Sequence, residues 1–491
     1  MSSELSLEEV AKHNDPASCW LIIHGSVYDV TEFLTQHPGG SQTLLQSAGT
    51  DATSAYDSVH HPLLVSQHLT AIGTCPSSSL IKTSPPTTTP SPLSKPPLHS
   101  HLSTHDFTHT ASLHLSPKAW SFASSAATDC ITHTQLNPNV FSLITLRPRI
   151  LRDVTACDIS TTILGCRTEA PFFIAPMAMQ RLFHLEGERE MSRGAAGAGL
   201  IQGVSTSSSF PLDEIIATAV EGQGHWLQLY VNKNREKTVT LLQEAVKLGY
   251  KAILVTVDAP VMGKREADER VLLDGTISSG TSGQKGQNDK RGGGIGRIMG
   301  QYVDASLRWE DLRWIKVAAG GLPVVVKGVQ TAADVMEATR RGVEGVYLSN
   351  HGGRSLDTSP PAIMTLLEIH TTCPEVLGKV KIFVDGGVKR GTDIFKALCL
   401  GATGVGVGRP FSTGVGVGRP FLYALNYGKK GVEHLADILK DELQTTMRMC
   451  GVTKLSELHP GLLNTAAIDH LIPGGENHEW ITWRRKEKSR L

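Results

Sequence analysis

Eight short apolar runs recur between residues 171 and 411, separated by segments that are long enough to form helices. The runs are residues 171–179, 199–206, 225–231, 252–259, 323–329, 345–352, 381–388 and one that begins near residue 404. Amphipathic patterns, such as residues 239–248 and 332–341, lie between them. Strand–helix alternation repeated eight times predicts an α/β (β/α)8 TIM barrel.

The barrel does not account for the whole chain. A stretch rich in Ser, Thr and Pro separates a small N-terminal unit from the barrel and has almost no apolar content. Such a segment cannot bury a core, so we expect a flexible linker. The predicted organisation is a small domain at 1–75, a linker at 76–114, the barrel at 115–475 and a basic tail at 476–491.

Composition excludes several classes of function. The 491 residues include 47 basic and 47 acidic side chains, so no global charge favours nucleic acid or an anionic membrane. No apolar stretch approaches the length of a membrane span, and the start of the chain does not resemble a signal peptide. The eight cysteines are scattered without zinc-type pairs, which fits free thiols in a reducing compartment.

Polar residues collect where the predicted strands end, which is where a barrel places its active site. The candidates are Ser205, Gln228, Tyr230, Thr256, Asp258, Lys327, His351, Arg354 and Asp385. The run SNHGGRSLD at 349–357 is the most informative. An Arg fork grips a carboxylate, and a His titrates near neutral pH and can take a proton from the same substrate. The motif therefore predicts a site for a small carboxylic acid.

The N-terminal segment resembles cytochrome b5 over essentially its whole length. The resemblance rests on VAKHN at 10–14, CWLIIHGSVYDVT at 19–31, HPGG at 37–40, AGTDAT at 48–53 and the histidine that follows at 60. It implies an α+β fold in which two histidines bind haem b from opposite sides. His37 is the first metal ligand, and His60 the second, with the adjacent His61 left open.

Residues 115–465 resemble the FMN-dependent α-hydroxy acid dehydrogenases and oxidases. The motifs are LRPRIL at 146–151, QLYV at 228–231, TVDAP at 256–260, VKGV at 326–329, SNHGGRSLD and VDGGVKRG at 384–391. Fusion of this barrel to a cytochrome b5-like domain resembles the flavocytochrome b2 family of L-lactate:cytochrome c oxidoreductases. The cofactors implied are FMN and haem b.

The resemblance implies a role for each catalytic residue. His351 is the base at the substrate α-carbon or hydroxyl, and Asp258 stabilises its imidazolium. Arg354 binds the substrate carboxylate and Tyr230 its hydroxyl, while Lys327 stabilises the reduced flavin.

Other positions are implied to bind cofactor or substrate. Ser205, Gln228 and Thr256 contact the isoalloxazine, and Arg265 supplies a second charge on the substrate side. The ribityl chain and phosphate are held by Asp385, Gly387, Lys389 and one Gly-Arg pair, either Gly408-Arg409 or Gly418-Arg419.

The implied function is oxidation of an L-2-hydroxy acid, L-lactate first, to the 2-oxo acid. Electrons pass from FMN to the haem and on to a one-electron acceptor such as cytochrome c. The alternatives are an oxidase that uses oxygen and an electron-transfer protein whose barrel is catalytically impaired. The barrel family also commonly forms homotetramers.

Two residues of the predicted pocket depart from the family pattern. Phe122 stands where a substrate-binding tyrosine is expected, and one lost hydrogen bond to a charged group costs roughly 1.5–3 kcal/mol. We therefore expect weaker substrate binding rather than lost chemistry. Met177 replaces a smaller residue at the expected flavin edge, whereas Ala178 and Ser207 are small, which suggests room for a side chain larger than methyl.

Two segments of the barrel are unusual. TGVGVGRPF occurs twice, at 403–411 and 413–421, although the family has one final strand of this kind. One barrel position cannot hold both copies, so we expect one to loop out or the last strand to be misplaced. The Gly-rich segment 276–301 predicts a mobile surface loop.

The chain ends in Ser489-Arg490-Leu491, which resembles a peroxisomal C-terminal tripeptide. No mitochondrial presequence precedes the haem domain. We expect a peroxisomal location, with the cytoplasm or the mitochondrial intermembrane space as alternatives.

Overall fold

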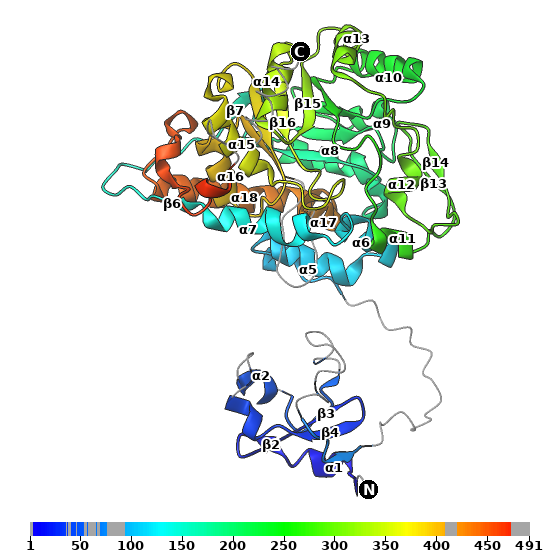
Figure 1. Ribbon diagram of the computed structural model, residues 1–491, viewed down its shortest axis with the longest axis vertical. Coiled ribbons are helices and arrows are strands. Elements are labelled where there is room, and N and C mark those ends of the chain that lie inside the picture. The colour runs from blue at the N-terminus through cyan, green and yellow to red at the C-terminus, as the bar shows by residue number, and fades with distance from the viewer. Residues whose placement is uncertain are drawn as a thin grey trace, which may run out of the picture. The chain divides into compact units, whose positions relative to one another are not determined.

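The computed structural model describes residues 3–35, 37, 41–45, 47–53, 56, 65, 69–75, 94–407 and 420–472. Contacts divide the chain into two compact units, Met1–Pro92 and Leu93–Leu491, shown in Figure 1. Of the predicted features, His60, the linker segment 76–93, both Gly-Arg pairs and the C-terminal tail lie outside the described residues.

The first unit is built on a five-stranded sheet with the order β1-β5-β4-β3-β2. Its strands are β1 (Ser3–Glu4), β2 (Asn14–Asp15), β3 (Ser18–Ile23), β4 (Ser26–Asp29) and β5 (Gly73–Thr74), with helices α1 (Leu7–Val10) and α2 (Ser41–Leu45). β3 and β4 pair as an antiparallel hairpin around His24 and Gly25, both with positive φ. Alternate β3 residues Cys19, Leu21 and Ile23 enter one apolar core, as the period of a strand requires.

The second unit is a closed barrel of eight parallel strands, so the predicted fold class is confirmed. The strands are β9 (Phe172–Met177), β10 (Gln202–Ser205), β11 (His225–Leu229), β12 (Ala252–Thr256), β15 (Val324–Val329), β16 (Gly345–Leu348), β17 (Lys381–Val384) and β18 (Gly404–Val407). Each lies inside, or at, one of the eight apolar runs. Both faces of these strands are covered, which explains why they are largely apolar rather than alternating between apolar and polar residues.

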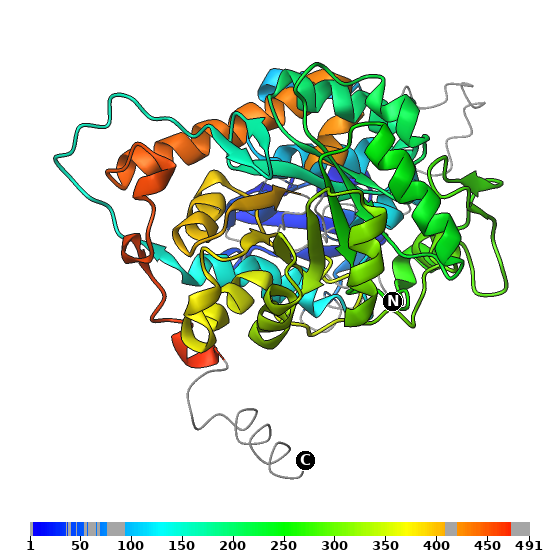
Figure 2. The same ribbon diagram turned by 90° about the horizontal axis from the view of Figure 1, so that it is seen from above.

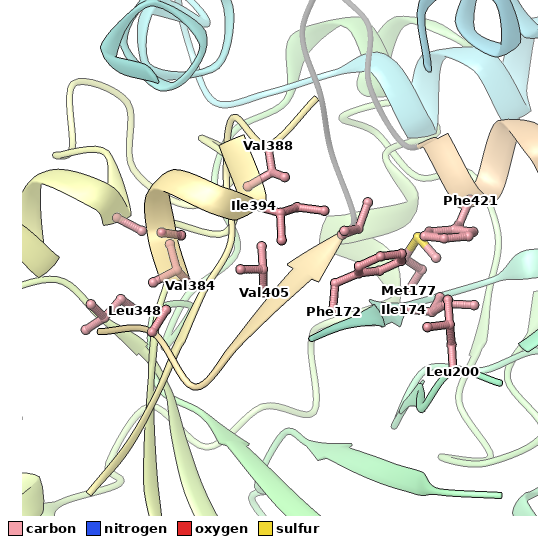
Figure 3. Packing of buried hydrophobic residues seen from close by; sticks show 14 of the residues in the cluster. Phe172, Ile174, Met177, Leu200, Leu348, Val384, Val388, Ile394, Val405 and Phe421 are labelled. Atoms are coloured by element: carbon pink, nitrogen blue, oxygen red, sulfur yellow. The ribbon is translucent and has the colours of Figure 1, made fainter. Parts of the chain in front are cut away.

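Helices surround the barrel, as Figure 1 and Figure 2 show. They are α8 (Gly187–Gly197), α9 (Leu212–Ile216), α10 (Arg235–Lys247), α13 (Leu312–Ala318), α14 (Ala332–Arg340), α15 (Ala362–Thr372), α16 (Gly391–Cys399), α17 (Pro420–Ala424) and α18 (Gly428–Met449). Their apolar faces pack on the outside of the strands. Figure 3 shows part of this layer, where Phe172 and Met177 of β9 share a cluster with Phe421 of α17.

Aromatic side chains fill the inside of the barrel. Phe173, Trp226, Tyr347 and Phe383 form one buried cluster, with ring centroids of Phe173 and Trp226 4.8 Å apart. Gly406 of β18 faces them, and a Cβ there would lie 1.8 Å from the Tyr347 hydroxyl. The barrel interior is therefore a packed core, which leaves only its mouth for a ligand.

The first copy of the repeated segment supplies the last barrel strand. β18 lies in this copy, whereas Pro420 and Phe421 of the second copy begin α17. Part of each copy is thus used, once as a strand and once as a helix start. The Gly-Arg pairs that were predicted to reach phosphate lie in 408–419, outside the described residues.

The predicted linker is wrong at its C-terminal end. Residues 98–114 form a short 3-10 helix (Leu98–Ser100) and α5 (Thr104–His114), which packs against α17. Phe107 and Ala111, one helical turn apart, are fully buried, and His101 is buried beside them. Lys95 donates to the carbonyl of Asn426 at 2.6 Å. The low apolar content was misleading because two well-spaced apolar residues and small threonines suffice to bury this helix.

The Gly-rich insertion is also more ordered than a surface loop. It contains the strand pair β13 (Ile277–Ser278) and β14 (Lys285–Gly286), followed by α12 (Ile295–Met299). Ile295 and Met299 are buried, and Arg297 pairs with Glu269 at 2.7 Å. The prediction of a surface loop is wrong for α12, because its apolar side chains face the mouth of the barrel.

Candidate active site

A cavity of about 120 Å³ opens at the C-terminal ends of the barrel strands. Its lining includes most of the residues singled out in the sequence: Phe122, Met177, Ser205, Ser207, Gln228, Tyr230, Thr256, Arg265, Lys327, His351, Arg354 and Asp385. Asp258 does not line the cavity, but it contacts His351, which does. Gly387 and Lys389 follow Asp385 in the chain but do not line the cavity.

His351 is held between an acid and a phenol. Its Nδ1 lies 2.8 Å from Asp258 Oδ1, and its Nε2 lies 3.3 Å from the Tyr230 hydroxyl. The residue has a φ of 57°, and Gly352 and Gly353 continue the left-handed turn with φ of 61° and 72°. This turn directs the imidazole back over the strand ends. A non-glycine residue in this conformation is strained, and such strain is typical of functional sites.

The charges around His351 fix its protonation. Burial lowers the pKa of His351, while the Asp258 carboxylate acts in the opposite direction. Burial would raise the pKa of Asp258, but the charges of His351 and Lys327 outweigh it and keep that pKa below its usual value. Asp258 is therefore ionised and only accepts hydrogen bonds, so Nδ1 carries the proton. Nε2 of the neutral ring is then free of a proton and can act as a base.

Two buried guanidinium groups lie on the substrate side. Arg354 is only 2% exposed, and its Nη1 donates to the carbonyl of Phe122 at 2.9 Å. Arg265 is 7% exposed, and its Nε donates to the carbonyl of Arg354 at 3.4 Å. Burial lowers the pKa of Arg265. Two cations that have lost their water favour a carboxylate ligand strongly, because it restores both charge balance and hydrogen bonds.

Phe122 lies where the sequence placed it. Its ring lies 5.0 Å from the Arg354 guanidinium carbon and lines the cavity. The ring supports the cation from one side but brings no hydroxyl to a bound carboxylate. The predicted loss of one substrate hydrogen bond thus has a structural basis.

Polar groups suited to a flavin form a row across the strand ends. Ser205 Oγ donates to Gln228 Oε1 at 3.1 Å, and Gln228 Nε2 donates to Thr256 Oγ1 at 2.9 Å. The sheet register creates this row, because it pairs Ser205 with Gln228 and Thr256 with Lys327. Lys327 Nζ reaches Ser349 Oγ at 3.0 Å and Asp385 Oδ2 at 3.6 Å. Amide and hydroxyl groups beside a buried cation match the donors and acceptors of an isoalloxazine ring, so these residues fit FMN.

Several residues of the site were missed by sequence reasoning. Ser349 and Asn350 lie within the recognised motif, and Asn350 exchanges hydrogen bonds with Asn137. The buried pair of Lys118 and Asp268, 2.7 Å apart, joins α6 (Pro117–Ser124) to α11 (Glu266–Arg270). No local pattern marks such a pair, since its partners are 150 residues apart in sequence.

His37 is the described candidate for a haem ligand in the first unit. Its ring is half-buried and lies 5.8 Å from that of Phe33. Phe33, Leu44, Leu45, Tyr56 and Leu69 add apolar surface against the nearby core. An imidazole at the border of such a cluster fits an axial ligand of haem. The proposed second ligand is not placed, because residues 57–64 are outside the description.

The barrel and its site define a class of protein. A histidine base paired with a buried carboxylate, two guanidinium groups for a carboxylate and a flavin-binding row are the parts of an FMN-dependent enzyme that oxidises 2-hydroxy acids.

Comparison with known proteins supports this class of enzyme. The profile of the FMN-dependent dehydrogenases matches residues 111–417 and 412–465, overlapping within the repeated segment. The profile of the cytochrome b5-like haem/steroid-binding domain matches residues 6–75. The chain belongs to the FMN-dependent dehydrogenase family and carries a cytochrome b5-like domain.

Individual relatives match different shares of the chain. The chain is 40% identical to L-lactate dehydrogenase (cytochrome) of Saccharomyces cerevisiae, over 95% of this chain and 80% of the relative. It is 40% identical to glycolate oxidase of Spinacia oleracea, over 66% of this chain and 85% of the relative. A variant of flavocytochrome b2 is similar in structure, with a TM-score of 0.66 at 40% identity over 79% of this chain and 92% of that one. A mandelate oxidase solved with (S)-2-phenylpropionate has a TM-score of 0.63 at 30% identity, over 74% and 98%.

These findings make the chain an FMN- and haem-dependent oxidoreductase that acts on CH–OH donors. Within the described part of the chain, no helix combines the length and apolar character needed to cross a membrane.

Proposed function

We propose that this protein oxidises L-lactate to the corresponding 2-oxo acid and passes the electrons through its haem domain to a one-electron acceptor. The observation that carries the proposal is the pairing of His351 with Asp258 beside two buried arginines, in a chain that also holds a cytochrome b5-like domain. The match over 95% of the chain to a cytochrome-linked lactate dehydrogenase supports it.

Each residue has a defined task in this reaction. Arg354 and Arg265 bind the carboxylate, which fixes the substrate with its C2 atom near His351. Tyr230 accepts or donates a hydrogen bond at the substrate hydroxyl. Nε2 of His351 takes a proton from the C2 carbon or from the hydroxyl, and Asp258 stabilises the resulting imidazolium through Nδ1. FMN, when bound beside Lys327, would supply the two-electron acceptor for the substrate, and the Lys327 cation would favour added negative charge there.

The final acceptor is part of the proposal. Two electrons leave each substrate molecule, whereas a haem carries one at a time, so the haem domain suits a one-electron acceptor such as a cytochrome c-like protein. Because both units belong to one chain, the effective concentration of the haem domain at the barrel is on the order of millimolar.

An anaerobic visible spectrum of the purified full chain, before and after L-lactate, tests the proposal. We expect the haem bands to change to the reduced form within the turnover time. If FMN is bound but only dithionite reduces the haem, the proposed route is wrong. Adding oxidised cytochrome c then tests the acceptor separately.

Direct reaction with oxygen is a second candidate, supported by the 40% identity to a glycolate oxidase. Oxygen uptake in the absence of any acceptor protein distinguishes it, since an oxidase consumes one oxygen for each lactate. The peroxisomal location stays a prediction that rests on Ser489-Arg490-Leu491. A fluorescent fusion with and without these three residues tests it.

A further inference from the structure

The cavity has a second wall that the reaction itself does not use. Six side chains form this side wall: Ala178, Met179, Ser207, Met262, Ile295 and Met299. They follow strands β9, β10 and β12 or belong to α12, and all except Ser207 are apolar. The rest of the cavity lining includes the polar row and the catalytic histidine. The two sides therefore differ in chemistry, and the side wall is suited to an apolar group.

The side wall lies next to Arg265, one of the two arginines assigned to the substrate carboxylate. A Cβ on Gly296 of α12 would lie 2.5 Å from Arg265 Nη1, so the helix backbone touches the guanidinium group. A Cβ on Gly300 would lie 2.5 Å from Met262 Sδ. These close contacts bring α12 and Met262 next to the carboxylate position. A substrate whose carboxylate is bound by Arg265 and Arg354 thus has the side wall within reach of its C2 substituent.

Two residues of the side wall, Ala178 and Ser207, are small. Ser207 lies 3.5 Å, by its hydroxyl, from the Tyr302 hydroxyl, and the backbone N–H of Met179 donates to the Ser207 carbonyl at 3.1 Å. Hydrogen bonds thus fix the positions of Ser207 and of the segment that carries Ala178. Neither side chain projects far, while Met262 and Met299 are long and unbranched and adapt their shape readily to a ligand.

A methyl group is small compared with a wall of six residues. Lactate would leave most of this apolar surface uncovered, whereas each methylene that the wall covers adds binding energy. We propose that the preferred substrates are L-2-hydroxy acids with an unbranched apolar side chain longer than the methyl of lactate. The inference rests on the proposed function, because it assumes that the carboxylate and C2 bind as described.

A chain-length series on the full holoenzyme tests this substrate class. The rate of flavin reduction is measured anaerobically with L-lactate, 2-hydroxybutanoate, 2-hydroxyhexanoate, 2-hydroxyoctanoate and (S)-mandelate. We expect kcat/KM to rise by about fourfold for each methylene that the wall covers, up to the length of the pocket. A steady fall from lactate upwards overturns the inference, and so does a preference for the branched aromatic mandelate.

The same series separates the two proposals. If lactate reduces the flavin but longer acids are slower, the substrate class is wrong and the proposed function stands. If no 2-hydroxy acid reduces a flavin that is visibly bound, the proposed function itself fails. Binding provides a second readout, because 2-oxo acids of increasing length should perturb the flavin absorbance at decreasing concentrations.

Substitutions in the side wall test its part directly. Ser207→Leu fills the wall, so the ratio of kcat/KM for 2-hydroxyhexanoate to that for lactate should fall at least tenfold. Ala178→Val narrows the same region by a smaller volume and covers the case in which Ser207→Leu folds poorly. Ser209→Leu is the matched control, since Ser209 is in the same loop but does not line the cavity. An unchanged ratio in both wall variants contradicts the assignment.

Discussion

The two sides of the cavity are built in different ways. The catalytic side takes its residues from strand ends or from the first turn after them, and the sheet register fixes neighbours such as Ser205 with Gln228 and Thr256 with Lys327. The side wall takes its residues from loops and from α12, which side-chain contacts hold in place. The pairing register of two strands can change only by whole residues, whereas the conformation of a loop can change gradually. The chemistry is therefore fixed by the barrel, and the choice of substrate is left to segments that can vary without disturbing it.

The largest expected effect lies on the catalytic side. His351→Gln keeps a polar side chain but removes the base, so kcat should fall by roughly 10²–10⁴-fold. FMN and haem content should stay unchanged, as checked by the visible spectrum. His370→Gln is the control, since His370 Nε2 contacts the carbonyl of Leu400 outside the cavity. A normal rate in His351→Gln would show that proton transfer does not pass through this residue.

The next effect concerns the support of the side wall. Lys118 Nζ contacts Asp268 Oδ1 and also the carbonyl of Val271 at 2.8 Å, and Asp268 Oδ2 accepts from Gly296 N–H at 3.3 Å. Lys118→Met leaves a carboxylate buried without its cation, which costs about 3–5 kcal/mol. The unfolding midpoint of the barrel, followed by flavin release, should fall accordingly.

Two further variants separate charge from position in this pair. Lys118→Arg keeps the cation and should recover most of the stability. Lys440→Met removes a lysine whose Nζ donates to the carbonyl of Ala198 at 2.6 Å, and it should cost less. Because Asp268 anchors Gly296, Lys118→Met should also raise KM for long substrates more than for lactate. Equal changes in KM for all substrates would contradict a link between the pair and the side wall.

A smaller effect is expected at Phe122, which lines the cavity next to Arg354. Phe122→Tyr adds a hydroxyl beside Arg354, and a hydrogen bond to a carboxylate contributes roughly 1.5–3 kcal/mol. KM should therefore fall about tenfold or more, with a lesser change in kcat. Phe122→Leu removes the ring without adding a hydroxyl and serves as the control. A higher kcat at constant KM would assign Phe122 to the chemical step instead.

The smallest expected effect is a shift of the pH profile. His351 must be neutral to accept a proton, so activity is lost as the pH falls through its pKa. Since burial lowers that pKa, the acid limb of kcat/KM should lie below about 6.5, the value for a free imidazole. Asp258 raises the pKa of His351, so Asp258→Asn should move the limb to still lower pH. A shift to higher pH in this variant would contradict the ion pair.

Much of the fold was predictable because each barrel strand is buried on both faces. Few folds other than a barrel accommodate eight largely apolar runs separated by helical segments. All eight runs form strands of the closed barrel. The short helix α5 and the insertion around α12 were not predictable in the same way. Their composition resembles that of loops, and only contacts with α17 and with the barrel mouth stabilise them as helices.

The sequence by itself determined which chemical groups stand at the strand ends, because strand periodicity and the SNHGGRSLD motif are local properties. Tertiary structure alone decided which groups meet. His351 and Asp258 are 93 residues apart, and Lys118 and Asp268 are 150 apart. It also decided that the first copy of the repeat forms β18, and that α12 reaches Arg265. Such pairings depend on closure of the barrel, which sets strand neighbours and register, and no local pattern encodes that closure.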